Sequence, residues 1–297
     1  MTNIQNKFPG KDITEEDIKS KFPLAAKRNK DHFSVIKVKD VEIGGDKIPM
    51  MAGPNTVENE EMALKIAENI SKLGNRIFRG GAFKPLSFPY RSDKYFEPRE
   101  KGLDWLKSVK EKFGLLIVTE VMDIRQIDNI SKVADILQIG TRNMQNYPLL
   151  VECAKTNIPI LLKRHYGASL RDFLGSAEYI LNEGNKNVIL CERGVSIPHT
   201  HRSTSRFSLD LQIIPAAKEI THLPIITDPS HATFWADWVE PMALASIGAG
   251  ADGVMIEVHN DPKNAAVDPL QPLDFKQYKN LLIKLKKIAN SLEKQVI

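Results

Sequence analysis

The sequence has few cysteines and no long apolar run. Its 297 residues include two cysteines, Cys153 and Cys191, which are too few to build the disulfide framework of a small secreted domain. No apolar stretch approaches the roughly 20 residues that a membrane-spanning helix needs. The polar N-terminus also lacks the apolar core of a signal peptide. We therefore expect a cytoplasmic protein that has no membrane partner.

The sequence also lacks a large excess of charge of one sign. Lysine and arginine number 41 against 37 for aspartate and glutamate, so the formal net charge is +4. Proteins that bind nucleic acid usually concentrate basic residues in a patch or stripe, whereas the charges here are spread along the chain. We expect no nucleic-acid partner.

The first part of the chain has only weak hydrophobic patterns. A short helix is predicted at 13–21. Alternating apolar residues in 32–50 indicate a small β-hairpin, in which Gly44 and Gly45 are the expected turn residues.

Eight short apolar runs follow, and each precedes a segment with apolar residues at helical spacing. The runs lie at 50–54, 76–81, 115–121, 136–140, 159–164, 187–194, 223–230 and 253–259. Near-continuous apolar runs are typical of parallel strands that are covered on both faces. A doubly wound open sheet is disfavoured because no GxGxxG turn follows the first run. We predict an α/β fold with an N-terminal arm and β-hairpin at 1–45 and a (β/α)8 TIM barrel at 46–297.

Polar side chains stand at the ends of these runs, where the active site of such a barrel forms. Five of them are cations, and we expect them to converge on one pocket: Arg79, Lys84, Arg142, Lys163 and Arg193. Their mutual repulsion is costly unless an anion neutralises it. The pattern therefore predicts a substrate with several negative charges, such as a phosphate plus a carboxylate.

A second group combines a histidine with two carboxylates. His231, Glu257 and Asp268 lie near or beyond the ends of the last two runs, so they are expected on adjacent strand ends. Such a set can hold a divalent metal, or it can orient a water molecule and move protons.

Eight stretches, taken in order, resemble a known enzyme family. They are GPNTVEN, FRGGAFKP, TEVMD, QIGTRNMQN, LLKR, VILCERG, DPSHAT and MIEVHNDP. They are similar to the short form of 3-deoxy-D-arabino-heptulosonate-7-phosphate (DAHP) synthase and to the related 3-deoxy-octulosonate-8-phosphate synthase. The resemblance implies a barrel enzyme that forms a C–C bond between phosphoenolpyruvate and erythrose 4-phosphate, giving DAHP and inorganic phosphate. It also implies a homo-oligomer, either a dimer or a tetramer.

The resemblance implies roles for matching residues. The five cations would bind phosphoenolpyruvate, in a pocket also lined by Glu120 and Gln138. The catalytic residues would be Lys84, which polarises the aldehyde, together with Asn55, His231, Glu257 and Asp268.

Asn55 departs from the pattern of the family's metal-dependent members, which have cysteine at this position. An amide oxygen is a weak, neutral ligand in comparison with a thiolate. We therefore favour a site that needs no cofactor. The alternative is a divalent metal, manganese or zinc, held by His231, Glu257 and Asp268.

The other departures lie on the side of the acceptor aldehyde. Where the family has an arginine in KPRT, this chain has Leu86, which cannot bind an anion. The candidate acceptor-binding residues are Ser87, Arg91, His165, Arg202 and Arg206. Two alternatives remain open beside a DAHP synthase. One is a sister synthase that uses arabinose 5-phosphate or another sugar, and the other is a catalytically dead barrel that acts as a binding protein.

Overall fold

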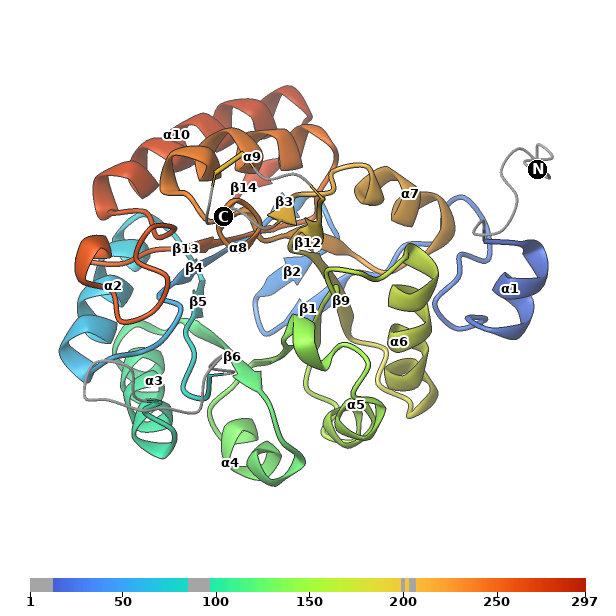
Figure 1. Cartoon of the computed structure of the whole chain (residues 1–297), viewed down its shortest axis with the longest axis horizontal. Helices are drawn as coiled ribbons and strands as arrows, with labels where there is room; N and C mark the ends of the chain where they lie inside the picture. The colour runs from blue at the N-terminus through green and yellow to red at the C-terminus, as the bar shows by residue number, and fades with distance from the viewer. Residues whose placement is uncertain (1–12, 85–96, 199–200, 203–206) are drawn as a thin grey trace.

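The predicted barrel is confirmed. The structure, a computed structural model, describes residues 13–84, 97–198, 201–202 and 207–297. Eight parallel strands close into a barrel in the order β12-β13-β4-β5-β6-β7-β8-β9 (Figure 1). These strands are β4 (Met50–Gly53), β5 (Ile77–Arg79), β6 (Leu116–Val121), β7 (Ile136–Ile139), β8 (Ile160–Lys163), β9 (Val188–Glu192), β12 (Ile225–Thr227) and β13 (Val254–Glu257). Every residue in them is buried, as the near-continuous apolar runs predict.

A ring of helices surrounds the barrel (Figure 1). It comprises α2 (Glu60–Lys72), α3 (Glu100–Phe113), α4 (Ile127–Ser131), α5 (Tyr147–Ala154), α6 (Leu170–Asn182), α7 (Ile213–Ile220), α8 (Pro229–Thr233), α9 (Ala236–Gly248) and α10 (Phe275–Ser291). Side-chain caps fix the start of several helices. Ser169 and Asp274, for example, open α6 and α10 with capping boxes. The helix bounds follow the predicted segments, and the segment from Ile124 gives only a short helical turn, η1 (Ile124–Gln126), before α4.

The predicted hairpin is confirmed, but its turn is not where the sequence indicated. Strands β1 (Ile36–Val38) and β2 (Val41–Ile43) pair antiparallel around Lys39 and Asp40. Lys39 takes a positive φ of 53° in this turn. Gly44 follows β2 instead and has a φ of 98°, and a Cβ there would lie 2.5 Å from the carbonyl oxygen of Ser34. The glycine is therefore needed for a close approach of two backbones rather than for the hairpin turn.

The hairpin closes one end of the barrel. Its buried side chains belong to the same apolar cluster as side chains from all eight barrel strands. Those of the hairpin are Ile36, Val38, Val41 and Ile43, all at most 4% exposed. We refer to this hairpin as the barrel floor. The predicted domain boundary between residues 45 and 46 stays a prediction. The floor and the barrel interior share one apolar core.

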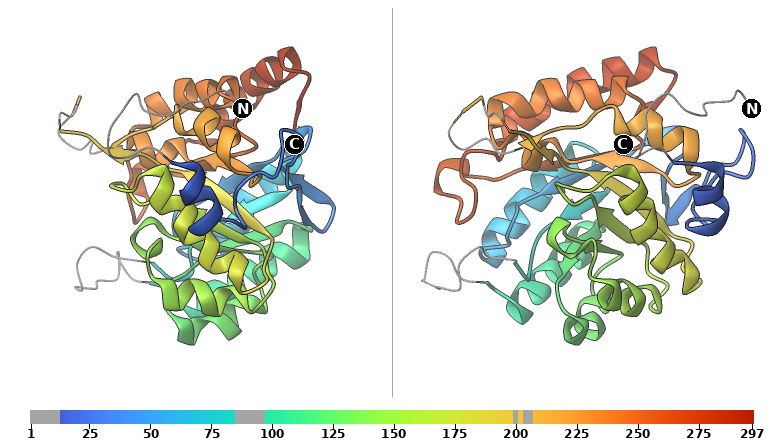
Figure 2. Two further views of the ribbon diagram at one scale, coloured as in Figure 1. Left: turned by 90° about the vertical axis from the view of Figure 1, so that its right-hand side faces the viewer. Right: turned by 45° about the vertical axis from the view of Figure 1, so that its right-hand side comes forward.

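The N-terminal arm packs against the outside of the helix ring. Its helix α1 (Glu15–Ser20) lies beside α6 in both views of Figure 2. Asp17 of α1 pairs with Arg171 at 2.6 Å, and Glu178 accepts a hydrogen bond from the backbone N–H of Ala25. At the other end of the chain, β14 (Gln295–Val296) pairs with β3 (Lys47–Ile48).

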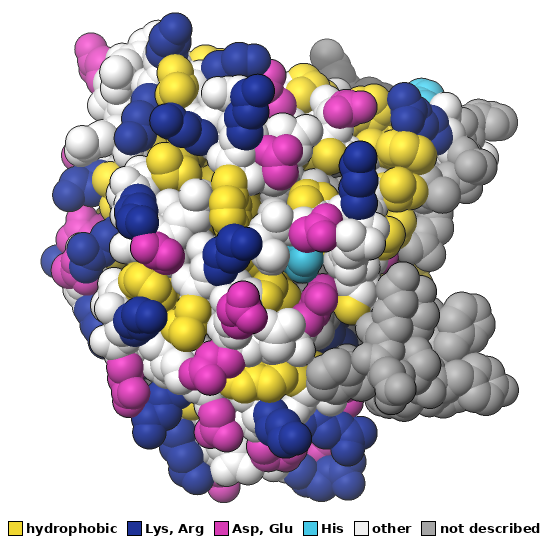
Figure 3. Space-filling view, turned by 90° about the vertical axis from the view of Figure 1, so that its left-hand side faces the viewer, with side chains coloured by type: hydrophobic (Ala, Val, Ile, Leu, Met, Phe, Trp, Pro, Cys, Tyr) yellow, Lys and Arg dark blue, Asp and Glu magenta, His cyan; other side chains and the backbone are white. Residues whose placement is uncertain are grey.

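Side chains of both charges cover the surface in mixed order. Figure 3 shows lysine and arginine interspersed with aspartate and glutamate on the face that lies at the left of Figure 1. None of the helices in the described part of the chain is both long and apolar enough to cross a membrane.

Candidate active site

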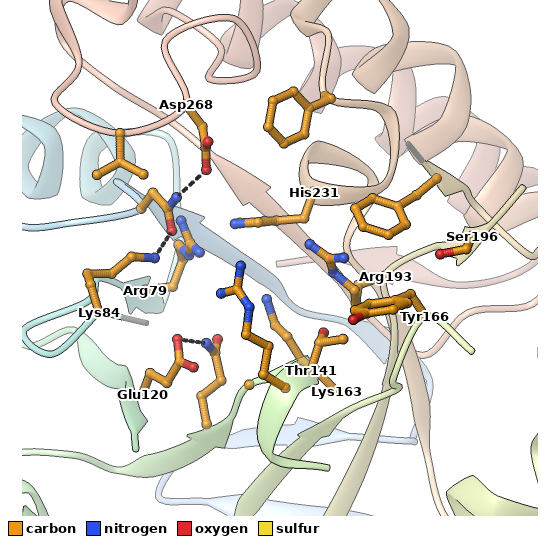
Figure 4. Close-up of a pocket in the computed structure, with 17 residues that line it drawn as sticks. Arg79, Lys84, Glu120, Thr141, Lys163, Tyr166, Arg193, Ser196, His231 and Asp268 are labelled. Atoms are coloured by element: carbon orange, nitrogen blue, oxygen red, sulfur yellow. Dashed lines mark hydrogen bonds between the residues drawn. The ribbon is translucent and has the colours of Figure 1, made fainter. Parts of the chain in front are cut away.

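One cavity of about 410 Å³ opens at the carboxyl ends of the barrel strands. All five predicted cations line it, as do Asn55, Glu120, Gln138, His231 and Asp268. Figure 4 shows the labelled Arg79, Lys163 and Arg193 reaching into the same space from different strands. The remaining lining residues are Gly140, Thr141, Tyr166, Ser196, Phe207, Phe234 and Val267. The structure therefore brings together most of the residues that the strand ends indicated.

Lys84, Asn55 and Asp268 form a hydrogen-bonded chain along one wall (Figure 4). Lys84 donates from Nζ to Asn55 Oδ1 at 2.5 Å, and Asn55 Nδ2 donates to Asp268 Oδ2 at 3.0 Å. Burial lowers the pKa of Lys84, and the nearby Arg79 lowers it further, while Glu120 and Asp268 oppose this effect. The ammonium group of Lys84 is thus a stronger acid than that of an exposed lysine.

Arg79 lies on the last residue of β5 and is 3% exposed. Its Nη1 is 3.8 Å from Glu257 Oε2, too far for a hydrogen bond, and this buried nitrogen has no hydrogen-bond partner among the described residues. A buried, unsatisfied guanidinium N–H costs free energy. Because Arg79 also lines the cavity, a bound anion is a suitable partner for this nitrogen.

Glu257 ends β13 behind the cavity lining and is 1% exposed. Gln271 donates a hydrogen bond to its Oε2 at 2.6 Å. Burial raises the pKa of Glu257 to about 7, with Asp268 adding to the shift while Arg79 opposes it. A carboxyl group with this pKa can accept or release a proton near neutral pH.

Lys163, Asp228 and His231 form a buried charged group. Asp228 Oδ2 accepts from Lys163 Nζ at 2.5 Å and lies 2.9 Å from His231 Nδ1. Asp228 is a carboxylate, because despite its burial the charge of Lys163 and the hydrogen bond from His231 keep its pKa well below the ordinary value. Burial lowers the pKa of His231 to about 3, although Asp228 opposes the shift. His231 is therefore neutral, with Nδ1–H donating to Asp228 and Nε2 facing Glu257 at 3.9 Å.

Arg193 enters the cavity directly after β9. Its guanidinium carbon lies 4.7 Å from the centre of the Phe207 ring, a cation–π distance. Burial lowers its pKa, and Asp228 opposes the shift. Phe207 belongs to β11 (Phe207–Ser208), which pairs with β10 (Val195–Ser196), so this small ribbon places an aromatic ring against a buried cation.

Glu120 and Gln138 lie on neighbouring strands at the base of the cavity, and Gln138 Nε2 donates to Glu120 Oε2 at 3.3 Å. Gly140 allows this arrangement, because a Cβ at that position would lie 1.9 Å from Glu120 Oε1.

The acceptor-side candidates are less closely tied to the cavity. His165 is not among the residues that line the cavity. The centre of its ring lies 4.1 Å from that of Tyr166, which does line the cavity. Arg202 places its guanidinium 4.2 Å from the Trp235 ring and 5.1 Å from the Trp238 ring. Three other candidates, Ser87, Arg91 and Arg206, lie outside the described residues.

The strand-end analysis missed the aromatic part of the lining. Tyr166, Phe207 and Phe234 line the cavity, but each follows its strand by several residues or belongs to a loop ribbon. A search for charged residues at strand ends cannot find them. Their only signal in the sequence is an aromatic residue within a polar loop.

The donor atoms do not fit a divalent metal in this arrangement. Of the two polar atoms in the Asn55 side-chain amide, the oxygen already accepts from Lys84 and the nitrogen donates to Asp268. Within the described ranges, no three histidine, cysteine, aspartate or glutamate side chains cluster as metal ligands. The two cysteines cannot take the place of the missing thiolate, because both are fully buried on other elements and burial raises the pKa of Cys153 to about 12.

Comparisons with known proteins agree with this architecture. The DAHP synthetase I family matches residues 22–294. A phospho-2-dehydro-3-deoxyheptonate aldolase of Thermotoga maritima is 38% identical over 291 residues, covering 97% of this chain and 84% of that protein. A 2-dehydro-3-deoxyphosphooctonate aldolase of Koribacter versatilis is 29% identical over 276 residues, covering 86% of this chain and 96% of that one.

Solved structures give the same result. The crystal structure of the Thermotoga maritima DAHP synthase superposes with a TM-score of 0.86 at 39% identity, covering 92% of this chain and 78% of that chain. A truncated form of the same synthase superposes with a TM-score of 0.84 at 38% identity, covering 93% of this chain and all of that one.

Proposed function

We propose that this chain, which belongs to the DAHP synthetase I family, condenses phosphoenolpyruvate with erythrose 4-phosphate to give DAHP and inorganic phosphate. The observation that carries the proposal is the single cavity into which five cations converge. Two carboxylates, Glu120 and Asp268, also line it, so the lining residues have an excess of three positive charges, part of which Asp228 offsets from behind the lining. Phosphoenolpyruvate suits this excess, because its phosphate carries about two negative charges and its carboxylate one more.

Phosphoenolpyruvate binds deep in the cavity. Arg142, Lys163 and Arg193 take part in holding its charged groups, and Arg79 offers it the buried Nη1. Charge-assisted hydrogen bonds of this kind are short and strong when the cations are held in place. Asp228 holds Lys163, and Phe207 packs against Arg193.

The aldehyde binds next to the Lys84–Asn55 pair. C3 of phosphoenolpyruvate attacks the aldehyde carbon, so that a C–C bond forms and negative charge develops on the aldehyde oxygen. Lys84 neutralises this charge and supplies the proton. One such donor contributes about 10²–10³-fold to the rate. Its lowered pKa favours the transfer.

Water completes the reaction at C2. The oxygen of water adds to C2, and the C–O bond to phosphate breaks, releasing inorganic phosphate and leaving the 2-keto group of the product. Glu257, with a pKa of about 7, lies behind the cavity lining and receives the proton of the water through His231, whose Nε2 is 3.9 Å from Glu257 Oε2. His231 lines the cavity with a neutral imidazole and helps to orient this water.

The residues of this chain perform these steps without a divalent metal. Asn55 stands where a thiolate would be needed, and its amide oxygen is engaged by Lys84. Activity should therefore survive exhaustive chelation. Loss of activity that manganese or zinc restores would contradict this part of the proposal.

Substitution of Lys84 tests the reaction. Lys84→Met keeps the length of the side chain and removes its charge, so we expect kcat to fall about 10²–10³-fold, measured as phosphate released from phosphoenolpyruvate and erythrose 4-phosphate. Lys65→Met, on the exposed face of α2, is the matched control. A Lys84→Met enzyme with normal kcat would refute the assigned role.

A panel of aldehydes tests the acceptor. Release of phosphate with arabinose 5-phosphate but not with erythrose 4-phosphate would identify a sister synthase. No release with any aldehyde, combined with tight binding of phosphoenolpyruvate, would identify a binding protein. Leu86, which stands where the family has an anion-binding arginine, is the reason to include acceptors other than erythrose 4-phosphate.

The proposal extends to the setting of the enzyme. We place it in the cytoplasm as a homo-oligomer, either a dimer or a tetramer, and light scattering of the purified protein measures the oligomeric state.

A further inference from the structure

Asp268 occupies a backbone position that needs support. It lies in the loop between β13 and α10 and has a positive φ of 51°. Non-glycine residues rarely adopt this conformation, which persists only where the surroundings hold it. The side chain nevertheless reaches across the cavity wall to Asn55 at 3.0 Å. Some other contact must therefore hold the loop at 260–268 in place.

Glu58 supplies this contact. It follows Asn55 by three residues, and its Oε1 accepts a hydrogen bond from the backbone N–H of Ala266 at 2.8 Å. The same oxygen lies 3.2 Å from His259 Nε2. One carboxylate thus joins the segment that carries Asn55 to the loop that ends at Asp268.

His259 holds the other end of the same loop. Its Nδ1 accepts a hydrogen bond from the backbone N–H of Asp261 at 3.0 Å. Because a backbone N–H only donates, Nδ1 must be unprotonated, and Nε2–H donates to Glu58. The side chain of His259 is 6% exposed, so these contacts are largely shielded from water.

We infer that Glu58 and His259 are positioning residues, which together form a clasp that holds Asp268 against Asn55 for the reaction. Neither side chain lines the cavity, and neither touches the substrates. The clasp acts through Asp268, which fixes the amide of Asn55 so that its oxygen faces Lys84. Loss of the clasp lets Asp268 move, and misplacement by about 1 Å in a catalytic array can cost roughly 10²-fold in rate.

The inference rests on the proposed function, and it makes a distinction within the cavity. Three of the cations that bind phosphoenolpyruvate, Arg142, Lys163 and Arg193, lie at the ends of β7, β8 and β9. Asn55 and Lys84, which contact the aldehyde, follow β4 and β5 instead. Disrupting the clasp should therefore lower kcat and leave the KM for phosphoenolpyruvate within about twofold. If Glu58 and His259 only stabilised the fold, their loss would not lower kcat selectively while the KM for phosphoenolpyruvate stayed constant.

Two matched pairs of variants test the clasp. Glu58→Ala removes the acceptor oxygen, and we expect kcat to fall about 10–100-fold. Glu58→Gln keeps an oxygen for Ala266 and His259, so it should restore kcat to within about threefold of the natural enzyme. Likewise His259→Gln places an amide N–H near the position of Nε2 and should retain activity, whereas His259→Asn replaces only the Nδ1 acceptor and should not.

The decisive measurement combines Glu58→Ala with Asp268→Ala. If the clasp acts through Asp268, the double variant is no slower than Asp268→Ala alone. Multiplying losses would overturn the inference, as would a Glu58→Ala enzyme with normal kcat.

A readout that needs no activity separates this inference from the proposed function. Hydrogen exchange of peptides spanning 260–268 should be faster in Glu58→Ala than in Glu58→Gln, since only the former frees the N–H of Ala266. Equal exchange would overturn the clasp even in an enzyme whose substrates prove to be different. An inactive natural protein with this difference in exchange would refute the proposed function and keep the clasp.

Discussion

Single residues set the cavity by close contacts between neighbouring strands. Glu120 and Gln138 can meet only because Gly140, directly after β7, has no side chain. The interior is close-packed, so even one added methyl group must displace a neighbour. This makes the glycine as important to the cavity as the charged residues that line it.

Gly140→Ala is expected to weaken the binding of phosphoenolpyruvate. The added Cβ would lie 1.9 Å from Glu120 Oε1 and push that carboxylate into the cavity, where it opposes the anion. We expect the dissociation constant, measured by calorimetry, to rise about tenfold, with a loss of stability of about 1–3 kcal/mol. Gly175→Ala on α6 is the control, because nothing lies within 4 Å of its Cβ position. Unchanged affinity in Gly140→Ala would contradict this account.

The sequence alone predicted that the five cations meet in one cavity, because each lies at or near the end of an apolar run and the barrel brings all strand ends to one rim. It did not predict Phe207 or Phe234, because the paths of the loops that carry them depend on tertiary contacts. It also placed the hairpin turn wrongly at Gly44–Gly45. A lysine, Lys39, accepts the positive φ of the turn, whereas Gly44 is required by its contact with Ser34, which only the folded chain reveals.

At the scale of elements, the arm is fastened to the barrel by a buried histidine. His222, which precedes β12, contacts the carbonyl oxygen of Leu24 through Nε2 at 2.8 Å and Ser34 Oγ through Nδ1 at 2.7 Å. The carbonyl can only accept, so Nε2 carries the proton and Nδ1 accepts from the serine. Burial lowers the pKa of His222, and His32, stacked on it at 4.3 Å, adds to the shift.

The stability of the protein should accordingly depend on His222 as the pH falls. Its folded pKa is lower than its unfolded value near 6.5. Its contribution is therefore complete above pH 6.5 and is lost as the pH falls toward the folded pKa. We expect the natural protein to have a higher free energy of unfolding in urea than His222→Gln. This difference should be largest above pH 7 and smaller at pH 5.5. A difference that is constant over this range would contradict the assignment.

At the scale of the whole molecule, the floor and the barrel share one apolar core. Ile43 in the floor is 0% exposed and belongs to the cluster that contains Met51, Ile77 and Met255. Deleting part of such a side chain leaves a cavity that the surroundings fill only partly.

Ile43→Ala should lower the free energy of unfolding by about 2–5 kcal/mol and leave the KM for phosphoenolpyruvate unchanged, because the floor lies at the end of the barrel opposite the cavity. Chemical denaturation and initial rates measure the two effects. Val35→Ala is the control, since Val35 is 42% exposed and surface changes usually stay within about 0.5 kcal/mol. An Ile43→Ala protein as stable as the control would show that the floor and the barrel do not fold as one unit.

The packed interior of the barrel closes the cavity from below, so substrates reach it only from the carboxyl ends of the strands. The substrate that binds deepest must therefore enter before the one that binds nearer the opening. Arg79 and Lys163, each at most 4% exposed, lie too far down to be reached once an aldehyde fills the entrance. Substrates therefore enter and products leave from the same side of the barrel. An unreactive aldehyde analogue should slow the release of bound phosphoenolpyruvate rather than compete with it for binding.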